Sequence, residues 1–358
     1  MRKFLLIAAV CLVAPICQAL VVLQYHHIST DTPPSTSLSP ALFRQHLAII
    51  EEQGYRVLAL PDVMQALKSG QSLPDKSVVI TFDDAYDSIY LAAFPLLKQR
   101  GWPFTIFVAT EPVERGLRGF ITWEQLQEMG RFGATLANHS HSHTHFLRQL
   151  DNESTNQWRQ RIRDEIEQAE NIIKQRTGQS HKLLAYPYGE YNRAIRNIVR
   201  DLGFTAFAQQ SGPIPGSTSH PLYDSLALPR FPFGGIYGSA EDFAVKLATL
   251  AMPIDSVKVV DEKGSDIRDT VLARDQLRPQ LQLSLQKNLP VVQCFASGQG
   301  AVPIERDGNE IIVQAPKAIP VGRSRYNCTA ASDQSGRFYW YSHFFIRKNN
   351  DGSWYPEP

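Results

Sequence analysis

Two adjacent aspartates, Asp83 and Asp84, end the apolar part of the segment SVVITFDDAYDSIY, which spans residues 77–90. Residues 78–80 are β-branched, so this part is predicted to be a buried strand. Two carboxylates side by side at the mouth of such a strand repel each other, and one of them must be paired with a cation or protonated. A plain turn leading into a helix is the alternative that needs no chemistry.

The segment NHSHSHTH, residues 138–145, is rich in histidine. His139 and His143 are four residues apart, so a helical turn is expected to put both imidazoles on one side, where they can share a metal. Two imidazoles and one carboxylate resemble the ligand set of a catalytic zinc site. Adventitious metal binding is the alternative, and His141 and His145 are expected to face solvent or to support the ligands.

The segment AYPYGEYN, residues 185–192, is predicted to be a strand end followed by a rigid turn. Proline fixes φ and glycine permits unusual backbone angles, so the Tyr-Pro-Tyr-Gly sequence can aim backbone N–H groups at one point. An oxyanion hole needs that arrangement. An ordinary turn is the alternative for this segment taken alone.

Taken in order, TFDD, HSxxH and YPYG resemble the motifs of the metal-dependent polysaccharide deacetylases that share the NodB homology domain (carbohydrate esterase family 4). The resemblance covers residues 20–245 and implies a distorted (β/α) barrel whose site lies at the C-terminal ends of the strands. It implies that Asp83 is the general base and that the backbone N–H of Tyr188 binds the oxyanion. The implied ligands of a divalent metal are Asp84, His139 and His143. Zn²⁺ is the expected ion, and Co²⁺, Ni²⁺ and Mn²⁺ suit the same ligands.

Two positions depart from the pattern of that family. The glycine that usually follows TFDD is Ala85, and the arginine that often opens the third motif is Tyr186. The second change removes the usual cationic partner of the base carboxylate. Arg230, in the segment LPRFP, is expected to replace it from the next strand, with a structural ion pair as the alternative.

The general acid is sought near the N-terminus, because the late Leu-x-His motif of the family is not evident in residues 20–245. An apolar strand ending in Tyr25, His26 and His27 resembles the opening strand of the exopolysaccharide deacetylases that act on poly-β-1,6-N-acetylglucosamine. This resemblance implies His26 as the general acid and His27 as the second candidate. Imidazole titrates near neutrality and suits that task. A structural histidine at a strand end is the alternative.

Residues 1–19 have the features of a secretory signal peptide, with two basic residues, a short apolar run and Ala19 at the expected cleavage site. The apolar run is too short for an ordinary membrane span, so a periplasmic or secreted protein is expected. Cys294 and Cys328 are the cysteines that remain after cleavage, and they are expected to form a disulfide in that compartment. Two buried free thiols are the alternative.

The length of the chain suits two domains. Helix and strand signals alternate through residues 20–245, as a βα fold requires. Residues 246–358 are instead predicted to form an antiparallel β-sandwich. Its last strand, residues 338–346, is aromatic on both faces and is expected to contact the barrel, with glycan binding as the alternative. The expected helices cover residues 39–52, 60–68, 87–100, 122–129, 156–176 and 193–202.

The sequence therefore predicts an exported, metal-dependent N-deacetylase of an N-acetylglucosamine-containing polysaccharide, with poly-β-1,6-N-acetylglucosamine favoured. Chitin oligomers, peptidoglycan and O-acetyl esters are alternative substrates, and a non-catalytic glycan-binding protein is the alternative from another class. Removing the two basic residues of the leader leaves 34 basic against 35 acidic residues, which favours neither a nucleic-acid nor a membrane-surface partner. Three aromatic residues are expected to stack on sugar rings, with core packing as the alternative: Trp123, Tyr191 and Phe231.

Overall fold

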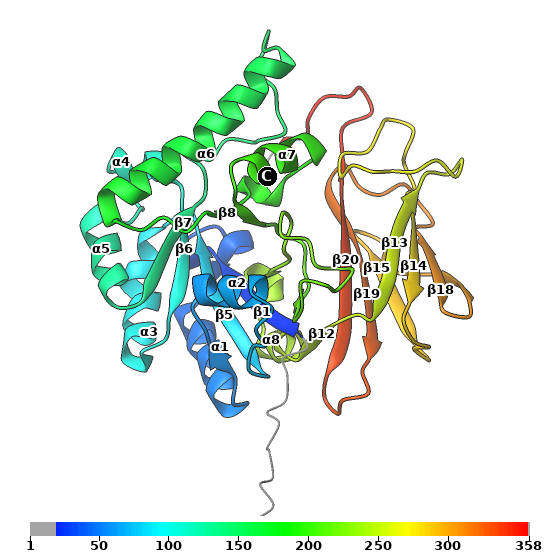
Figure 1. The fold of residues 1–358 in the computed structure, drawn as a ribbon, viewed down its shortest axis with the longest axis horizontal. Coiled ribbons are helices and arrows are strands. Elements are labelled where there is room, and N and C mark those ends of the chain that lie inside the picture. Colours follow the sequence, from blue (N-terminus) through cyan, green and yellow to red (C-terminus); the bar gives the residue numbers. More distant parts are fainter. Residues whose placement is uncertain (1–18, 357–358) are drawn as a thin grey trace, which may run out of the picture.

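The structure is a computed structural model that describes residues 19–356. Two units lie side by side (Figure 1): a helix-covered sheet formed by the N-terminal part of the chain and a β-sandwich formed by the C-terminal part. The predicted signal peptide lies outside the described residues except for Ala19, the first residue of strand β1 (Ala19–Tyr25). No helix within residues 19–356 has the length and apolar character needed to cross a membrane.

The N-terminal unit is built on a mostly parallel, nine-stranded sheet that curls on itself. Its strands follow the order β10, β1, β5, β6, β7, β8 and β9, while β4 pairs with β5 and β11 pairs with β1. The pairing of β10 with β1 is antiparallel and the others are parallel, which confirms the predicted distorted barrel. The further bounds are β4 Arg56–Val57, β5 Ser77–Asp83, β6 Phe104–Val108, β7 Ala134–Asn138, β8 Leu183–Ala185, β9 Thr205–Phe207, β10 Ile214–Pro215 and β11 Phe231–Pro232.

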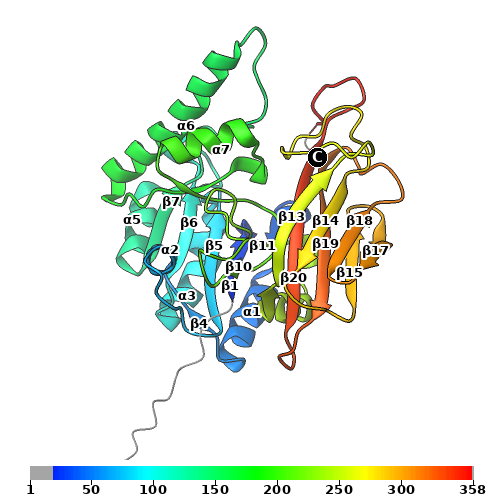
Figure 2. The same ribbon diagram turned by 45° about the vertical axis from the view of Figure 1, so that its right-hand side comes forward.

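Helices cover the outside of this sheet (Figure 2). A capping box begins the helix that starts at Trp123, because the Thr122 hydroxyl accepts the Gln125 N–H while the Gln125 side chain accepts the Thr122 N–H. Five of the six expected helices are confirmed within two residues at each end. The bounds are α1 Pro40–Glu52, α2 Leu60–Lys68, α3 Phe94–Arg100, α4 Thr110–Glu114, α5 Trp123–Arg131, α6 Thr155–Thr177, α7 Arg193–Asp201 and α8 Ala240–Leu247.

The expected single helix before Gly101 is divided in two. A π-helical turn, η2 (Ile89–Ala93), precedes α3, and Pro95 stands in the first turn of α3. Proline has no N–H to donate to the preceding turn, so the regular α-helical ladder is interrupted there. The Ser88 hydroxyl does not cap this helix and instead accepts the Ile28 N–H at 3.1 Å. Gly101 ends the helix in the left-handed conformation, with φ of 63°.

Two packed sheets form the C-terminal unit, and one lies in front of the other in Figure 2. One sheet holds β12, β20, β19, β15 and β16 in that order, and the other holds β13, β14, β18 and β17. The predicted antiparallel pairing is confirmed except for β12, which pairs parallel with β20. The bounds are β12 Thr249–Ala251, β13 Ile254–Val260, β14 Gln280–Leu285, β15 Val292–Ala296, β16 Gly300–Val302, β17 Ile304–Asp307, β18 Glu310–Gln314, β19 Gly322–Ala331 and β20 Phe338–Arg347.

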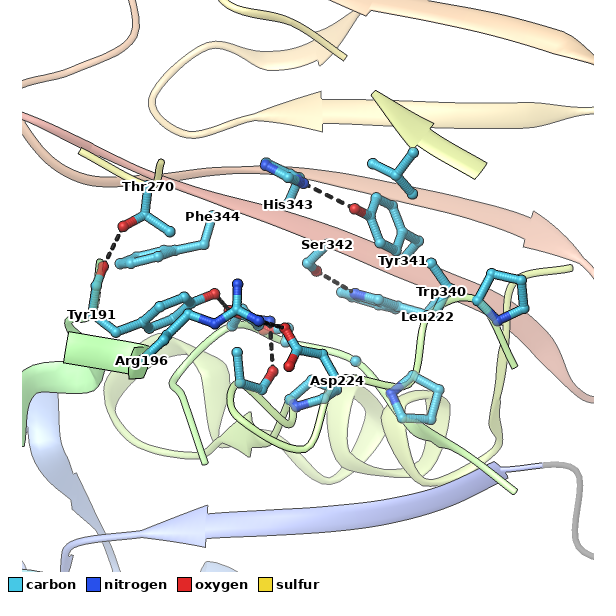
Figure 3. A pocket seen from close by; sticks show the side chains of 18 of the residues that line it. Tyr191, Arg196, Leu222, Asp224, Thr270, Trp340, Tyr341, Ser342, His343 and Phe344 are labelled. Atoms are coloured by element: carbon cyan, nitrogen blue, oxygen red, sulfur yellow. Dashed lines mark hydrogen bonds and ion pairs between the residues drawn. The ribbon is translucent and has the colours of Figure 1, made fainter. Parts of the chain in front are cut away.

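Strand β20 contacts the barrel, as its aromatic sequence predicts. The Phe344 ring stacks on Tyr191 with 5.9 Å between centroids, and Trp340 packs edge-on against Phe231 at 5.3 Å. Between these contacts lies a cavity of about 310 Å³, lined on the barrel side by residues that include Tyr191 and on the other side by β20 (Figure 3). The two units therefore meet along one face of β20.

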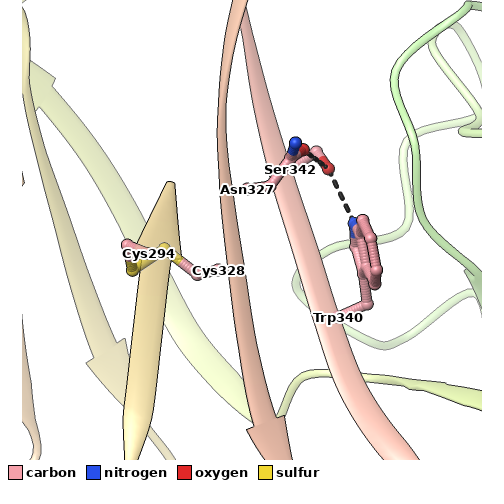
Figure 4. The surroundings of a disulfide bond; sticks show 5 residues. All are labelled: Cys294, Asn327, Cys328, Trp340 and Ser342. Atoms are coloured by element: carbon pink, nitrogen blue, oxygen red, sulfur yellow. Dashed lines mark hydrogen bonds between the residues drawn. A yellow bond between two sulfur atoms is a disulfide. The ribbon is translucent and has the colours of Figure 1, made fainter. Parts of the chain in front are cut away.

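Cys294 and Cys328 form the predicted disulfide, which joins β15 to β19 inside the sandwich (Figure 4). The bond links residues 34 apart in sequence. In the loop-entropy model it restricts the unfolded chain and so raises the free energy of unfolding by about 3 to 4 kcal/mol. Replacing both cysteines by alanine is therefore expected to lower the free energy of unfolding by that amount. Urea unfolding of the oxidised wild type and the variant measures the difference, and equal midpoints and slopes would contradict the expectation.

Candidate active site

Three side chains converge at the carboxyl ends of β5 and β7. The Nε2 atoms of His139 and His143 each lie 3.2 Å from Oδ1 of Asp84, and the three atoms lie within 4.8 Å of one another. Asp84 and His139 are buried, whereas His143 is partly exposed. These are the three metal ligands that the resemblance implies, and we call them the metal triad.

Left-handed backbone angles turn these ligands inward. Asp84 and Ala85 have φ of 73° and 67°, and Ser140 and His143 have φ of 66° and 55°. The expected helical turn from His139 to His143 is therefore wrong, because the segment is an irregular loop in which the Ser140 hydroxyl accepts the His143 N–H at 3.0 Å. L-residues seldom adopt positive φ, which accounts for the glycine that the family usually carries where this chain has Ala85.

The donor set of the metal triad fits a cation. His139 Nδ1 lies 2.8 Å from the carbonyl oxygen of Ala185, so Nδ1 carries a hydrogen and Nε2 faces Asp84. A neutral imidazole in this tautomer directs a lone pair at a carboxylate oxygen, which is unfavourable unless a proton or a metal ion lies between them. Two imidazoles and one carboxylate are ligands that a divalent ion such as Zn²⁺ accepts.

The pKa values of the metal triad reflect this demand for positive charge. Burial acts to lower the pKa of His139, but the hydrogen bond to Asp84 and the nearby Asp83 carboxylate outweigh it, so the pKa is raised. Burial acts to raise the pKa of Asp84, yet His143 and His139 hold it well below its usual value. The directions of the pKa shifts of His139 and Asp84 both favour a positive charge beside the Asp84 carboxylate.

Asp83 is held in a buried ion pair with Arg230. The guanidinium donates from Nη1 to Oδ1 at 2.7 Å and from Nη2 to Oδ2 at 2.8 Å, and both residues are at most 1% exposed. Gln24 Nε2 adds a hydrogen bond to Oδ2 at 2.7 Å. Burial acts to raise the pKa of Asp83, but Arg230 outweighs it and keeps the pKa low, so the carboxylate is ionised at neutral pH. The sequence predicts the contact with Arg230 but not the one with Gln24.

The YPYG turn lies against the metal triad. Its 3₁₀ turn η3 spans Pro187–Gly189, and Tyr188 within it has φ of 58°. The Tyr188 ring centroid lies 4.6 Å from that of His143 and 3.7 Å from that of His145, on which it stacks. The turn therefore lies beside the triad, and the role of the Tyr188 N–H in oxyanion binding stays a prediction.

The other two histidines of the histidine segment support its loop. His141 Nδ1 lies 2.9 Å from Thr110 Oγ1, and the His141 N–H donates to Glu165 at 3.1 Å. His145 Nδ1 lies 3.0 Å from Glu190 Oε2. Both imidazoles are thus engaged by the protein, which agrees with the supporting role expected as one of two possibilities.

Glu190 joins the two units behind the YPYG turn. It is fully buried and accepts hydrogen bonds from the Tyr355 hydroxyl and from Arg323 Nη1, the latter at 3.4 Å, in addition to its contact with His145. Arg323 and Tyr355 belong to the C-terminal unit, so the sandwich braces loops of the site. The sequence does not reveal this network, because its members are far apart along the chain and carry no shared motif.

His26 lies between β1 and β2 (His27–Ile28), at the same end of the sheet. Burial lowers the pKa of His26, while the Asp84 and Asp83 carboxylates act against that change, which shows that this imidazole is electrostatically coupled to the site. His27 stacks on Tyr86 with 3.6 Å between centroids, and its Nδ1 is buried without a hydrogen-bond partner among the described residues. Their assignment as general acid and second candidate stays a prediction.

The three aromatic residues expected to stack on sugars are core residues instead. Trp123 is 8% exposed, Tyr191 is 6% exposed and Phe231 is fully buried. The ring of Tyr191 is covered by Phe344 and that of Phe231 by Trp340, both from β20. Rings covered in this way have no free face for a sugar, so the stacking prediction is wrong.

Comparison with known proteins agrees with this geometry. The polysaccharide deacetylase family model matches residues 70–207. Poly-beta-1,6-N-acetyl-D-glucosamine N-deacetylase of Escherichia coli K12 is 25% identical over 224 residues, which cover 52% of this chain and 33% of the relative. The Staphylococcus aureus N315 protein of the same name is 26% identical over 186 residues, which cover 50% of this chain and 63% of the relative. The matched part thus spans less than two thirds of either relative.

Two solved structures share the fold of the N-terminal unit. Streptococcus pyogenes deacetylase PplD in complex with acetate has a TM-score of 0.55 at 25% identity, with 64% of this chain and 98% of that chain covered. IcaB from Ammonifex degensii has a TM-score of 0.54 at 25% identity, with 63% and 97% covered. With the three motifs and the converged metal triad, these matches show that the chain carries a polysaccharide deacetylase domain of the NodB homology type, from a family of hydrolases acting on amide bonds.

Proposed function

We propose that this chain is a metal-dependent hydrolase that removes N-acetyl groups from an N-acetylglucosamine-containing polysaccharide, with poly-β-1,6-N-acetylglucosamine as the favoured substrate. The observation that carries the proposal is the buried, ionised Asp83 next in sequence to a triad of converging metal-ligand atoms. A protein that only binds glycan has no need of a base beside a metal. The names of the Escherichia coli and Staphylococcus aureus relatives support the choice of substrate.

Each residue of the site has a task that suits its chemistry. A divalent metal held by the metal triad would polarise the acetamide carbonyl and make a water molecule more acidic. Asp83 would accept the proton of the attacking water; Arg230 and Gln24 occupy three of about four acceptor positions on its carboxylate, which leaves one on Oδ1. The Tyr188 N–H would donate to the developing oxyanion. His26 would pass a proton to the leaving amine, giving acetate and a free amine.

The proposal includes export and two domains. A disulfide persists in oxidising compartments, so the Cys294–Cys328 bond supports a periplasmic or secreted protein cleaved near Ala19. Helix α8 packs against α1, and the next strand, β12, already belongs to the sandwich. This change of partners supports a deacetylase domain over residues 20–245 and an accessory domain over residues 246–358.

Acetate release from β-1,6- and β-1,4-linked N-acetylglucosamine oligomers of equal length tests the proposal. The Zn²⁺-loaded protein is expected to release acetate and to prefer the β-1,6 linkage. Removing the metal with a chelator is expected to abolish release, and added Zn²⁺ should restore it. Release from the β-1,4 oligomer alone would make chitin-type chains the substrate, and no release from either oligomer with metal bound would contradict N-deacetylation of these chains.

Replacing His26 by glutamine is expected to lower kcat/KM about 10- to 100-fold at pH 7, because the variant has no proton to deliver to the amine. Burial lowers the pKa of His26, so the protonated form is lost at a pH below the ordinary histidine pKa, and wild-type kcat/KM should fall as pH rises through that range. The variant should lack this decline. Profiles of kcat/KM against pH measure both effects, with His27→Gln as the matched control. A decline that persists in His26→Gln would assign the acid to another group.

A further inference from the structure

A second cavity, of about 580 Å³, lies between the barrel and the sandwich. Figure 4 shows that Trp340 projects from β20 on the side away from the disulfide, toward the barrel, where it forms part of the cavity wall. Helix α8 and the 3₁₀ turn η4 (Gly235–Tyr237) supply part of the opposite wall. The lining residues that carry charge or an aromatic ring are Tyr237, Lys246, Phe295, Arg323, Arg325 and Trp340.

All charged side chains that line this cavity are cationic. Its lining contains three cationic side chains and no carboxylate. Arg323 is partly neutralised by Glu190 behind the wall. Arg325 donates from Nη1 to the Gln209 carbonyl at 3.3 Å and to the Ser211 hydroxyl at 3.2 Å, both of them neutral. Within residues 19–356, no carboxylate forms an ion pair with Arg325 or Lys246.

The direct hydrogen-bond partners of these two cations are neutral, because Lys246 Nζ donates to the Tyr237 carbonyl at 3.3 Å and lies 4.9 Å from the centre of the Phe233 ring. Burial lowers the pKa of Arg325 and of Lys246. Asp242 acts to raise the pKa of Lys246 and Tyr237 acts to raise that of Arg325, whereas Arg323 lowers the pKa of Arg325 and Arg325 lowers that of Lys246. Partly desolvated cations that repel one another are unfavourable unless an anion approaches them. An anionic group entering the cavity would gain charge-assisted hydrogen bonds from both side chains.

The remaining walls suit a sugar. Tyr237 is 60% exposed and Phe295 is 36% exposed, so both present apolar surface beside the cations. The cavity also adjoins the active site, because the Arg323 guanidinium lies 5.7 Å from the centre of the Tyr188 ring. That ring in turn lies 4.6 Å from the His143 ring. The cavity wall is therefore separated from the metal triad by the ring of Tyr188.

We propose that this cavity binds an acidic sugar unit of the polysaccharide while an N-acetylglucosamine unit of the same chain lies at the metal triad. The inference rests on the proposed N-deacetylase activity, and it replaces the favoured homopolymer of N-acetylglucosamine by a polymer that also carries carboxylates. Arg325 and Lys246 bind the acidic group, and the neighbouring aromatic rings contact the sugar ring. A polymer of N-acetylglucosamine alone would leave both cations without an anion.

Binding of two tetrasaccharides of equal length tests the proposal. One alternates N-acetylglucosamine with glucuronate, and the other contains N-acetylglucosamine alone. Calorimetry is performed on the full, Zn²⁺-loaded chain carrying Asp83→Asn, so that turnover does not interfere. The acidic tetrasaccharide is expected to bind about tenfold more tightly at low salt, as charge-assisted hydrogen bonds predict.

Matched variants show which side chains cause the preference for the acidic tetrasaccharide. Arg325→Gln and Lys246→Gln are each expected to remove most of the tenfold preference, whereas Arg325→Lys should retain most of it. Arg44→Gln and Lys317→Gln remove exposed cations outside the cavity lining and should leave the preference intact. Thermal unfolding of each variant shows whether it is folded, and Lys246→Gln keeps the test valid where Arg325→Gln unfolds.

Equal affinities for the two tetrasaccharides would overturn the proposal, and so would a preference that survives both Arg325→Gln and Lys246→Gln. Inorganic phosphate or acetate binding as tightly as the acidic tetrasaccharide, with the same dependence on Arg325, would make this a site for free anions and also overturn it. Binding is measured without turnover. An intact acidic preference in a protein that releases no acetate would therefore overturn the deacetylase assignment alone.

Discussion

Replacing Asp83 by asparagine is expected to lower kcat/KM for deacetylation by about 10²- to 10⁴-fold. Asparagine has nearly the same shape, but its amide does not accept the proton of an attacking water. Asp83 is not one of the three converging ligand atoms, so the variant should still bind Zn²⁺ at the wild-type stoichiometry. Acetate release and metal content, measured on the same folded sample, check both parts of this expectation.

The matched control is Asp87→Asn, the same change four residues further along the chain. Asp87 is partly buried and its backbone N–H donates to the Gly119 carbonyl, which the substitution preserves. This control is expected to keep activity close to that of the wild type. Full activity in Asp83→Asn would exclude Asp83 as the base, whereas loss of both activity and metal would make it a ligand instead.

Replacing Arg230 by methionine is expected to lower the free energy of unfolding by about 3 to 5 kcal/mol, the usual effect of breaking a buried ion pair on one side. The change leaves the Asp83 carboxylate buried without its cation. It also removes hydrogen bonds from Arg230 to the Ala208 carbonyl at 3.1 Å and to the Thr81 hydroxyl at 3.3 Å. Urea unfolding at pH 7 measures the loss, which is large beside a typical total stability of about 5 to 15 kcal/mol.

The pH dependence of this loss identifies its cause. Because the folded-state pKa of Asp83 is depressed, the ion pair stabilises the protein above the unfolded-state pKa, and this stability is lost as pH falls through the folded-state value. The difference between wild type and Arg230→Met should therefore narrow below about pH 4. The double variant Asp83→Leu with Arg230→Met removes both charges and should recover much of the loss. A loss that is independent of pH and persists in the double variant would point to packing alone.

The residues of the site can be predicted from the sequence because they lie in short motifs. Asp84, His139 and His143 are residue types that seldom cluster without a shared cation, and their converged positions agree with that expectation. The geometry of the loop is not readable in the same way. Spacing alone favours a helical turn for His139 and His143, whereas positive φ at Ser140 and His143 brings the imidazoles together without one.

Much of the fold is also predictable, because most of its elements carry a clear apolar period. Strand β19 is the main exception, because its sequence does not predict a strand. Its inward positions include Gly322, Ser324 and Cys328, so the alternation of buried and exposed residues is not an alternation of apolar and polar ones. Pairing with β15 on one side and β20 on the other makes this segment a strand.

The sequence by itself determined which residues can carry the chemistry, since base, ligands and turn lie in contiguous motifs beside predictable strands. Only the tertiary structure decided what surrounds them. Arg230 reaches Asp83 across 147 residues of chain, and Tyr355 reaches Glu190 across 165. Strand β20 likewise covers Tyr191 and Phe231, so these two rings pack in the core although the sequence predicts them at the site. Such contacts form only when distant segments fold against each other, so no local sequence pattern predicts them.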